Sequence, residues 1–246
     1  MIDLHTHILP GIDDGAENET TSLRMLLMQQ REGVDRLFLT PHFDCRKGSV
    51  EEFLRRREDA FDRLRRAAAG SATPEMKLGA EVRFSPELMR EDLSRLTLGG
   101  SDYLLLELSP RRYPAVLEEA VEEMLDRGYI PILAHVERFF YFCGHPDLLA
   151  GLIEQGALAQ VSADVVIDRK RFSFSHACIK HDLAQFVASD AHNTDVRPPN
   201  LGRAAAKLPD VFRRRMNAFL NAVWEGRDVP SAPDPSTPNP FFCRRP

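Results

Sequence analysis

Hydrophobic residues recur along this 246-residue chain in short runs, which are separated by longer amphipathic or polar stretches. Seven such runs lie at residues 2–8, 34–43, 77–84, 102–109, 129–137, 157–163 and 184–192. Short apolar runs predict buried strands, and the stretches between them predict helices that cover both faces of a sheet. The pattern therefore predicts an α/β fold built on a parallel sheet.

Three of the stretches between the strands have clear helix signals, at residues 18–33, 49–70 and 113–128. Asn18 or Thr20 is a candidate N-cap of the first helix and Ser49 of the second, because their side chains can accept a hydrogen bond from the first helical turn. The first and third stretches end in Gly33 and Gly128, where helices commonly stop.

The number of strand–helix units indicates how the sheet closes. Seven units in a chain of this length fit a closed or nearly closed barrel better than an open, doubly wound sheet. We expect residues 1–228 to form this barrel as a single domain. Residues 229–246 are rich in proline and lack a helical or strand pattern, so we expect an extended or disordered tail.

Composition and charge narrow the classes of function. Hydrophobic residues make up 43% of the chain and charged residues 28%, as in an ordinary globular protein. The net charge of −5 argues against a nucleic-acid partner, because such binding depends on neutralising phosphates. Arginine runs at residues 55–57 and 213–215 lie at helical spacing among acidic or apolar residues, so we interpret them as solvated helix faces. The usual nucleotide-binding loops, GxGxxG and GxxxxGK[ST], are missing.

Cysteine spacing and hydropathy predict a cytoplasmic location. The four cysteines, which are far apart and form no CxxC pair, are Cys45, Cys143, Cys178 and Cys243. This spacing favours reduced thiols over a disulfide framework or a structural zinc site. No signal-peptide pattern precedes the first strand and no apolar run approaches about 20 residues, so we expect no membrane insertion.

Histidines and carboxylates gather at one end of the predicted strands. His5 and His7 alternate within the first strand, so their side chains face the same way. Candidates at or near the carboxyl ends of later strands are His42, Glu81, Glu107, His135, Asp190 and His192. Each alone could be a loop residue, a helix cap or half of a buried salt bridge. Together they indicate a site, because the carboxyl ends of parallel strands converge on one face of a barrel.

The residue types indicate a metal centre. Imidazoles and carboxylates without a thiolate suit manganese, iron or zinc. With Asp14 included, the set is too large for one ion, so two or three ions are expected. The four carboxylates Asp14, Glu81, Glu107 and Asp190 supply a charge of −4, so three divalent cations would leave the centre at about +2. Such a centre would attract a phosphate dianion and lower the pKa of a bound water. Metal-assisted hydrolysis is the reaction class that follows.

Five segments resemble the motifs of a known superfamily: DLHTHILPGIDDG, TPHF, GAEVRF, AHVERF and SDAHN. They are similar to motifs of the polymerase-and-histidinol-phosphatase (PHP) metal-dependent phosphoesterases. The stretches MIDLHTHILPGIDDGA, GVDRLFLTPHF and RGYIPILAHVERF most resemble the bacterial tyrosine-protein phosphatases of capsule and exopolysaccharide operons. The resemblance runs from residue 1 to about residue 205. It implies a distorted seven-stranded (β/α)7 barrel that holds three metal ions, usually manganese.

The resemblance also implies a role for each matching residue. The first ion would be held by His5, His7, Glu81 and Asp190. Glu81 would bridge to a second ion, completed by Glu107 and His135. The third would be held by Asp14, His42 and His192, with Asp13 as the neighbouring alternative to Asp14. The residues that match the family's phosphate-binding arginines are Arg138 and Arg197. Their planar guanidinium groups suit phosphate oxygens.

Two segments depart from the pattern of the family. Residues 162–177, SADVVIDRKRFSFSHA, are bulkier and more basic than the glycine-rich segment often found there, and we expect them to shape the substrate mouth. The turn TPHF lacks a further histidine that often follows it. That histidine is not among the implied ligands, so the metal centre is expected to survive.

The leading hypothesis is a metal-dependent phosphatase that acts on the phosphotyrosyl peptide or tail of a bacterial tyrosine kinase of polysaccharide export. The alternative is a small-molecule phosphatase, such as histidinol-phosphate phosphatase, which would use the same ligands. A PHP module that serves a polymerase is disfavoured by the intact ligand set. A cysteine phosphatase is excluded, because no cysteine is followed six residues later by arginine. The sequence leaves the oligomeric state open.

Overall fold

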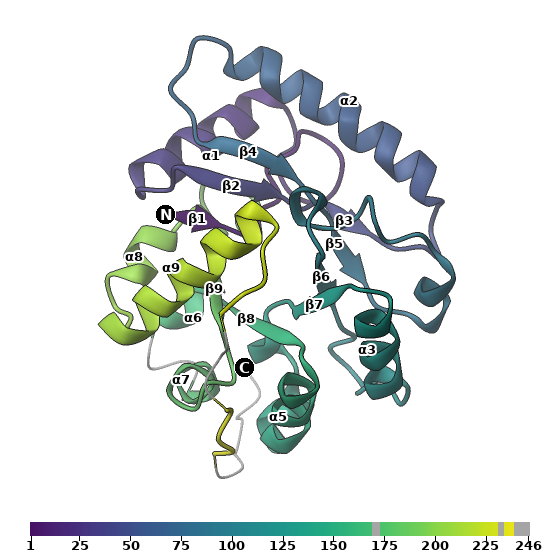
Figure 1. Cartoon of the computed structure of the whole chain (residues 1–246). Coiled ribbons are helices and arrows are strands. Elements are labelled where there is room, and N and C mark those ends of the chain that lie inside the picture. Colours follow the sequence, from purple (N-terminus) through teal and green to yellow (C-terminus); the bar gives the residue numbers. More distant parts are fainter. Residues whose placement is uncertain (169–172, 231–233, 239–246) are drawn as a thin grey trace.

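The strands run parallel to one another in two sheets (Figure 1). The computed structural model describes residues 1–168, 173–230 and 234–238. One sheet has the order β1-β2-β4, formed by Ile2–Asp3, Arg36–Leu39 and Glu75–Leu78. The other has the order β3-β5-β6-β7-β8-β9, formed by His42–Phe43, Glu81–Arg83, Tyr103–Glu107, Ile130–Leu133, Leu158–Ser162 and Phe186–Ala188. The predicted α/β architecture with parallel pairing is confirmed.

Two of the seven expected strands are each divided between the sheets, so the described residues contain nine strands. The run 34–43 gives β2 and β3, which separate at Pro41 because proline has no N–H to donate to a ladder. The run 77–84 gives β4 and β5, which separate at Gly79, where a Cβ would lie 2.8 Å from Leu98 Cδ2. The two sheets are therefore joined through two shared stretches of chain.

An isolated bridge links the chain after β1 to the chain after β9. Thr6 pairs with Ala191 in parallel fashion. The His7 N–H donates to the Ala191 carbonyl at 2.9 Å, and the Asp190 N–H donates to the His5 carbonyl at 3.0 Å. The carboxyl ends of the first and last strands therefore lie side by side.

Side-chain caps determine where the first two helices begin. In α1 (Glu19–Arg31) the Asn18 side chain accepts a hydrogen bond from the Thr21 N–H, which decides between the two candidate caps. In α2 (Val50–Ala68) Ser49 accepts a hydrogen bond from the Glu52 N–H, as predicted.

The remaining described helices surround the strands (Figure 1). They are α3 (Leu117–Asp126), α4 (Phe140–Gly144), α5 (Pro146–Gln155), α6 (Ala163–Ile167), α7 (Ser173–Lys180), α8 (Leu201–Ala205) and α9 (Asp210–Glu225). Three 3-10 turns are η1 (Pro86–Arg90), η2 (Leu98–Gly100) and η3 (Val136–Arg138). Helix α3 is shorter than the expected span 113–128. No helix within the described residues is both long and apolar enough to cross a membrane.

The hydrophobic core lies between the strands and the helices around them. Leu37, Leu105, Leu133 and Val187, one from each of four strands, are fully buried and pack with Leu26 of α1. Buried ionisable residues stand out against this apolar background, among them His5, His7, Glu81, His135, Asp190 and His192.

Arg57 corrects the expectation that residues 55–57 form a solvated helix face. Its side chain is only 6% exposed. Its Nη1 donates to the carbonyls of Gly79 at 2.9 Å and Arg95 at 3.1 Å. Burial lowers the pKa of Arg57 to about 10. Helical spacing alone could not indicate this, because the receiving carbonyls lie 22 and 38 residues further along the chain.

The state of the cysteines also differs from the expected set of reduced thiols. Cys45 and Cys178 have free thiols, but Cys143 is disulfide-bonded. Cys243 lies outside the described residues. The expectation of four reduced thiols was therefore wrong, because a disulfide depends on proximity in the folded chain and not on sequence spacing.

The described tail residues contact the rest of the chain at two places. The Val229 N–H donates to the Tyr103 hydroxyl at 2.9 Å, and this hydroxyl donates to the Arg227 carbonyl at 2.9 Å. The Ser236 N–H donates to the His181 carbonyl at 3.0 Å. Residues 231–233 and 239–246 of the tail lie outside the described part of the chain, and the boundary at residue 229 stays a prediction.

Candidate metal centre

His5 and His7 lie next to each other in the interior. Both side chains are fully buried, and their Nε2 atoms are 3.1 Å apart. The bridge at Thr6 holds this stretch of chain against the segment that follows β9. Burial alone would lower the pKa of His5, but the nearby carboxylates of Glu81 and Asp190 raise it above its ordinary value.

Glu81, the first residue of β5, is the centre of the cluster and is 1% exposed. Its Oε2 lies 3.3 Å from His5 Nε2 and 3.2 Å from His7 Nε2. The same Oε2 lies 2.9 Å from His42 Nδ1, and Oε1 lies 2.8 Å from His135 Nε2. Burial alone would raise the pKa of Glu81, but the charge of His5 and the hydrogen bonds from His135 and His42 hold it well below its usual range. Glu81 is therefore a buried anion surrounded by imidazoles.

His135 and Asp190 have an unusual backbone conformation at the ends of β7 and β9. Their φ angles are 35° and 51°, in the left-handed region that residues with a side chain rarely adopt. Asp190 Oδ1 lies 3.4 Å from His5 Nε2 and 3.5 Å from His192 Nδ1. Strained conformations of this kind concentrate at functional sites, and here they direct both side chains toward the cluster.

Asp13 and Asp14 are adjacent in the chain but contact different histidine atoms. Asp14 Oδ1 lies 3.2 Å from His42 Nε2 and 3.6 Å from His192 Nε2. Asp13 Oδ2 lies 2.8 Å from His7 Nδ1 and accepts a hydrogen bond from the His42 N–H at 3.0 Å. The structure therefore brings Asp14 into the cluster, whereas Asp13 orients His7 from the side away from the other ligands.

The candidate ligand atoms form three overlapping groups, each with its atoms within 4.8 Å of one another. The groups are His7, Asp14, His42 and His192; His5, His7 and Glu81; and His42, Glu81 and Glu107. His7 lies both in the group of Asp14 and in that of Glu81, and His42 lies in the group of Glu81 and Glu107. His135 Nε2 is 3.9 Å from Glu107 Oε1.

The donor set fits divalent metal ions. His192 Nε2 is buried but has no hydrogen-bond partner among the described residues. An unsatisfied buried polar atom costs about 1–3 kcal/mol, which a shared cation would offset. Burial and the neighbouring charge of His7 lower the pKa of His192 to about 3, so its imidazole is neutral and free to bind a metal.

Arg138 and Arg197 meet on Asp190. Arg138 ends η3, Arg197 follows β9, and the Nη2 atom of each donates to Asp190 Oδ2. Their side chains are 41% and 31% exposed, so both extend from the cluster to solvent. A guanidinium group in this place can bind phosphate oxygens at the rim of the cluster.

An open cavity of about 600 Å³ borders the cluster. It is lined by the candidate ligands Asp14, His42 and Glu107, and the basic residues on its wall are Arg46, Lys47 and Arg83. The cavity therefore brings three candidate ligands and three basic side chains together at one opening.

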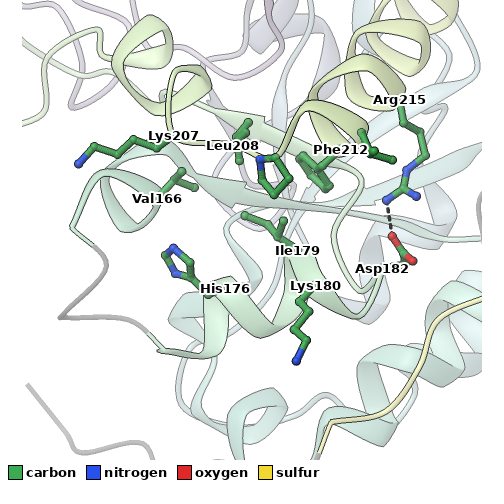
Figure 2. Close-up of a pocket in the computed structure, with 11 residues that line it drawn as sticks. Val166, His176, Ile179, Lys180, Asp182, Lys207, Leu208, Phe212 and Arg215 are labelled. Carbon is green, nitrogen blue, oxygen red and sulfur yellow. Dashed lines mark hydrogen bonds and ion pairs between the residues drawn. The ribbon is translucent and has the colours of Figure 1, made fainter.

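A second cavity of about 470 Å³ lies among α6, α7 and α9 (Figure 2). Ile179 and Phe212 contribute apolar side chains, and Arg215 forms an ion pair with Asp182 at the edge. None of the candidate ligands lines it, so it does not belong to the metal centre.

Comparison with known proteins decides the family. A family described as "Capsular polysaccharide synthesis, CpsB/CapC" matches residues 1–219. The chain belongs to this family. The tyrosine-protein phosphatase YwqE of Bacillus subtilis is 32% identical over 227 residues, which cover 89% of this chain and 88% of YwqE. The tyrosine-protein phosphatase CpsB of Streptococcus pneumoniae is 29% identical over 215 residues, which cover 83% of this chain and 88% of that protein.

A solved structure extends the likeness of this CpsB/CapC chain to its fold. It is described as "Crystal structures of YwqE from Bacillus subtilis and CpsB from Streptococcus pneumoniae, unique metal-dependent tyrosine phosphatases". The TM-score is 0.85 at 26% identity, and the match covers 98% of this chain and 99% of the other. The resemblance to the capsule-operon tyrosine phosphatases is confirmed.

Two buried polar residues that support the centre of this CpsB/CapC chain were not predicted. Gln160 on β8 accepts a hydrogen bond from the His135 N–H at 3.1 Å through an Oε1 that lies 3.0 Å from His5 Nδ1. Asp3 on β1 accepts a hydrogen bond from the Ser189 N–H at 3.1 Å and so connects β1 to the end of β9. The available signal was a polar residue inside an apolar strand, in ALAQVSA and IDLHTHI.

Gly15 has to remain glycine for the turn that carries Asp13 and Asp14. A Cβ at Gly15 would lie 2.1 Å from the His7 carbonyl oxygen. We expect Gly15→Ala to displace both carboxylates and to lower kcat/KM by about 10²-fold, since small misplacements of catalytic groups have effects of that size. The matched control is Gly151→Ala in α5, where the added Cβ has no heavy atom within 4 Å. Full activity of Gly15→Ala would contradict the assignment of this turn to the centre.

Proposed function

We propose that this chain is a metal-dependent protein-tyrosine phosphatase that acts on a bacterial tyrosine kinase of capsule or exopolysaccharide synthesis. The observation that carries the proposal is the convergence of the predicted ligands His5, His7, His42 and His135 on Glu81, beside an open cavity. Membership of the CpsB/CapC family and the tyrosine-phosphatase names of its relatives support the same reaction.

The proposed centre holds three ions, with manganese as the first choice and iron or zinc as alternatives. The residues that would hold them are His5, His7, Asp14, His42, Glu81, Glu107, His135, Asp190 and His192. When bound, the ions supply positive charge for the phosphate and lower the pKa of a water molecule at the site. The position of Glu81 in two of the ligand groups suits a carboxylate that is shared between ions.

Arg138 and Arg197 are the proposed catalytic residues. A guanidinium has five N–H donors, so each can keep its hydrogen bond to Asp190 and bind phosphate oxygens with the remaining N–H groups. Two planar guanidinium groups bound to one phosphate fix its orientation toward the attacking water. They also neutralise the negative charge that develops in the transition state.

Exposure of the rim favours a polypeptide substrate. The side chains of His42 and Asp14 are 37% and 68% exposed, so the outer edge of the cluster opens to solvent. A phosphotyrosyl side chain on a peptide can enter such a mouth, whereas a small substrate favours an enclosed pocket. The histidinol-phosphate alternative has no support from the relatives named above, which are tyrosine-protein phosphatases.

We further propose that the two sheets form one distorted seven-stranded (β/α)7 barrel. The division of two strands between the sheets and the Thr6–Ala191 bridge support a single closed arrangement. The proposed barrel domain is residues 1–228, followed by the tail at 229–246. A cytoplasmic location is part of the proposal; the free thiols of Cys45 and Cys178 support it, and the disulfide of Cys143 does not.

The test compares kcat/KM for a phosphotyrosyl peptide and for histidinol phosphate on the manganese-reconstituted full chain. We expect the peptide to be preferred by tenfold or more, which is about 1.4 kcal/mol in the transition state. A phosphoseryl peptide of the same sequence is the matched control for the aromatic leaving group. A preference for histidinol phosphate would overturn the proposed substrate, and hydrolysis of neither with manganese bound would overturn the activity.

A further inference from the structure

Arg83 lies two residues after Glu81 on the same strand. Side chains at alternate positions of a strand face the same way, so Arg83 points from β5 toward the space that Glu81 occupies. Its side chain is 28% exposed and lines the 600 Å³ cavity that borders the metal centre. A cation is therefore built into the strand that supplies the central carboxylate.

The partner of Arg83 is the candidate ligand Glu107. The two residues are direct neighbours in the register of β5 and β6. Arg83 Nη1 is 2.6 Å from Glu107 Oε2, while Glu107 Oε1 is 3.9 Å from His135 Nε2. The two carboxylate oxygens of Glu107 are thus divided between Arg83 and the ligand cluster.

Glu107 depends more than Glu81 on a partner from outside the ligand cluster. Imidazoles surround Glu81, and two arginines donate hydrogen bonds to Asp190. The Glu107 side chain is 19% exposed at the cavity wall, where water can compete for it. A planar guanidinium fixed by strand register restrains such a carboxylate better than water does.

We infer that Arg83 is a positioning residue of the metal centre. It holds Glu107 by one oxygen so that the other stays on the side of His135, where it would be available to a metal ion; partners of metal ligands commonly set ligand orientation in this way. The inference rests on the proposed function and adds to it a residue outside the implied ligand and phosphate-binding sets.

The experiment is a calorimetric titration of Mn²⁺ into the metal-free full chain. We expect Arg83→Met to weaken the affinity for one Mn²⁺ ion by about 10- to 100-fold, the usual cost of removing a partner of a ligand. Arg83→Lys keeps the positive charge but loses the planar guanidinium group. Its Mn²⁺ affinity is expected to lie between those of wild type and Arg83→Met. The matched control is Arg46→Met, because Arg46 lines the same cavity but pairs with Asp44, and its Mn²⁺ affinity is expected to equal that of wild type.

Energetic coupling between Arg83 and Glu107 distinguishes a positioning role of Arg83 from other roles. In a double-mutant cycle, Glu107→Gln is expected to abolish most of the effect of Arg83→Met on Mn²⁺ affinity. The melting temperature of each metal-free variant checks that the fold is intact. Wild-type Mn²⁺ affinity in a folded Arg83→Met would overturn the inference. So would normal Mn²⁺ affinity combined with a raised KM for the phosphotyrosyl peptide, which would make Arg83 a substrate contact. Failure of the proposed function differs from both, because wild type itself would then bind no Mn²⁺ or hydrolyse no phosphotyrosine.

Discussion

Glu81→Gln is expected to lose most of the bound metal and to lower kcat/KM by more than about 10²-fold, the scale on which removal of a charge-stabilising group acts. The amide has nearly the shape of the carboxylate but lacks its charge, and the Glu81 oxygens lie within 3.3 Å of His5, His7, His42 and His135. Metal content by mass spectrometry and kcat/KM on a phosphotyrosyl peptide measure the two effects. Glu107→Ala is expected to change both quantities in the same direction.

The control for this variant is Glu75→Gln. Glu75 begins β4, and its side chain is exposed and belongs to none of the ligand groups. Normal metal content and turnover are expected there. Near-normal turnover in both Glu81→Gln and Glu107→Ala would contradict the assignment of the centre.

Arg138→Lys is expected to lower kcat/KM by about 10²- to 10³-fold while the metal content stays near that of wild type. Lysine keeps the positive charge but cannot bind Asp190 and a phosphate through one planar fork. Arg138→Lys therefore differs from Glu81→Gln in that it keeps its metal. The measurement pairs steady-state kinetics with metal analysis of the same preparation.

Arg127→Lys is the control for the exchange of arginine for lysine. Arg127 donates to the carbonyls of Met89 and Glu91 and lines no part of the cavity at the metal centre. Its kcat/KM is expected to stay at the wild-type value. An Arg138→Lys variant that kept its rate, or one that lost metal in proportion to its activity, would contradict the role of Arg138 in phosphate binding.

Local sequence signals predicted the elements of the fold well. Apolar runs and helix caps depend on residues close together in the chain, which is why the strand positions and the caps Asn18 and Ser49 agree with the structure. Predictions that depend on distant segments failed more often. Arg57 is buried because of carbonyls in other segments, and Cys143 is disulfide-bonded.

For the metal centre, the sequence by itself determined which kinds of side chain occur within or just after the apolar runs, and hence that a cation site of nitrogen and oxygen donors was to be expected. Only the tertiary structure decided how they combine. It grouped His42 with Glu107, placed Asp14 in the cluster with Asp13 behind His7, and paired Arg83 with Glu107. The reason is physical: distances of 3 to 4 Å between such groups depend on strand register and on the left-handed turns at His135 and Asp190, which no local pattern of residues specifies.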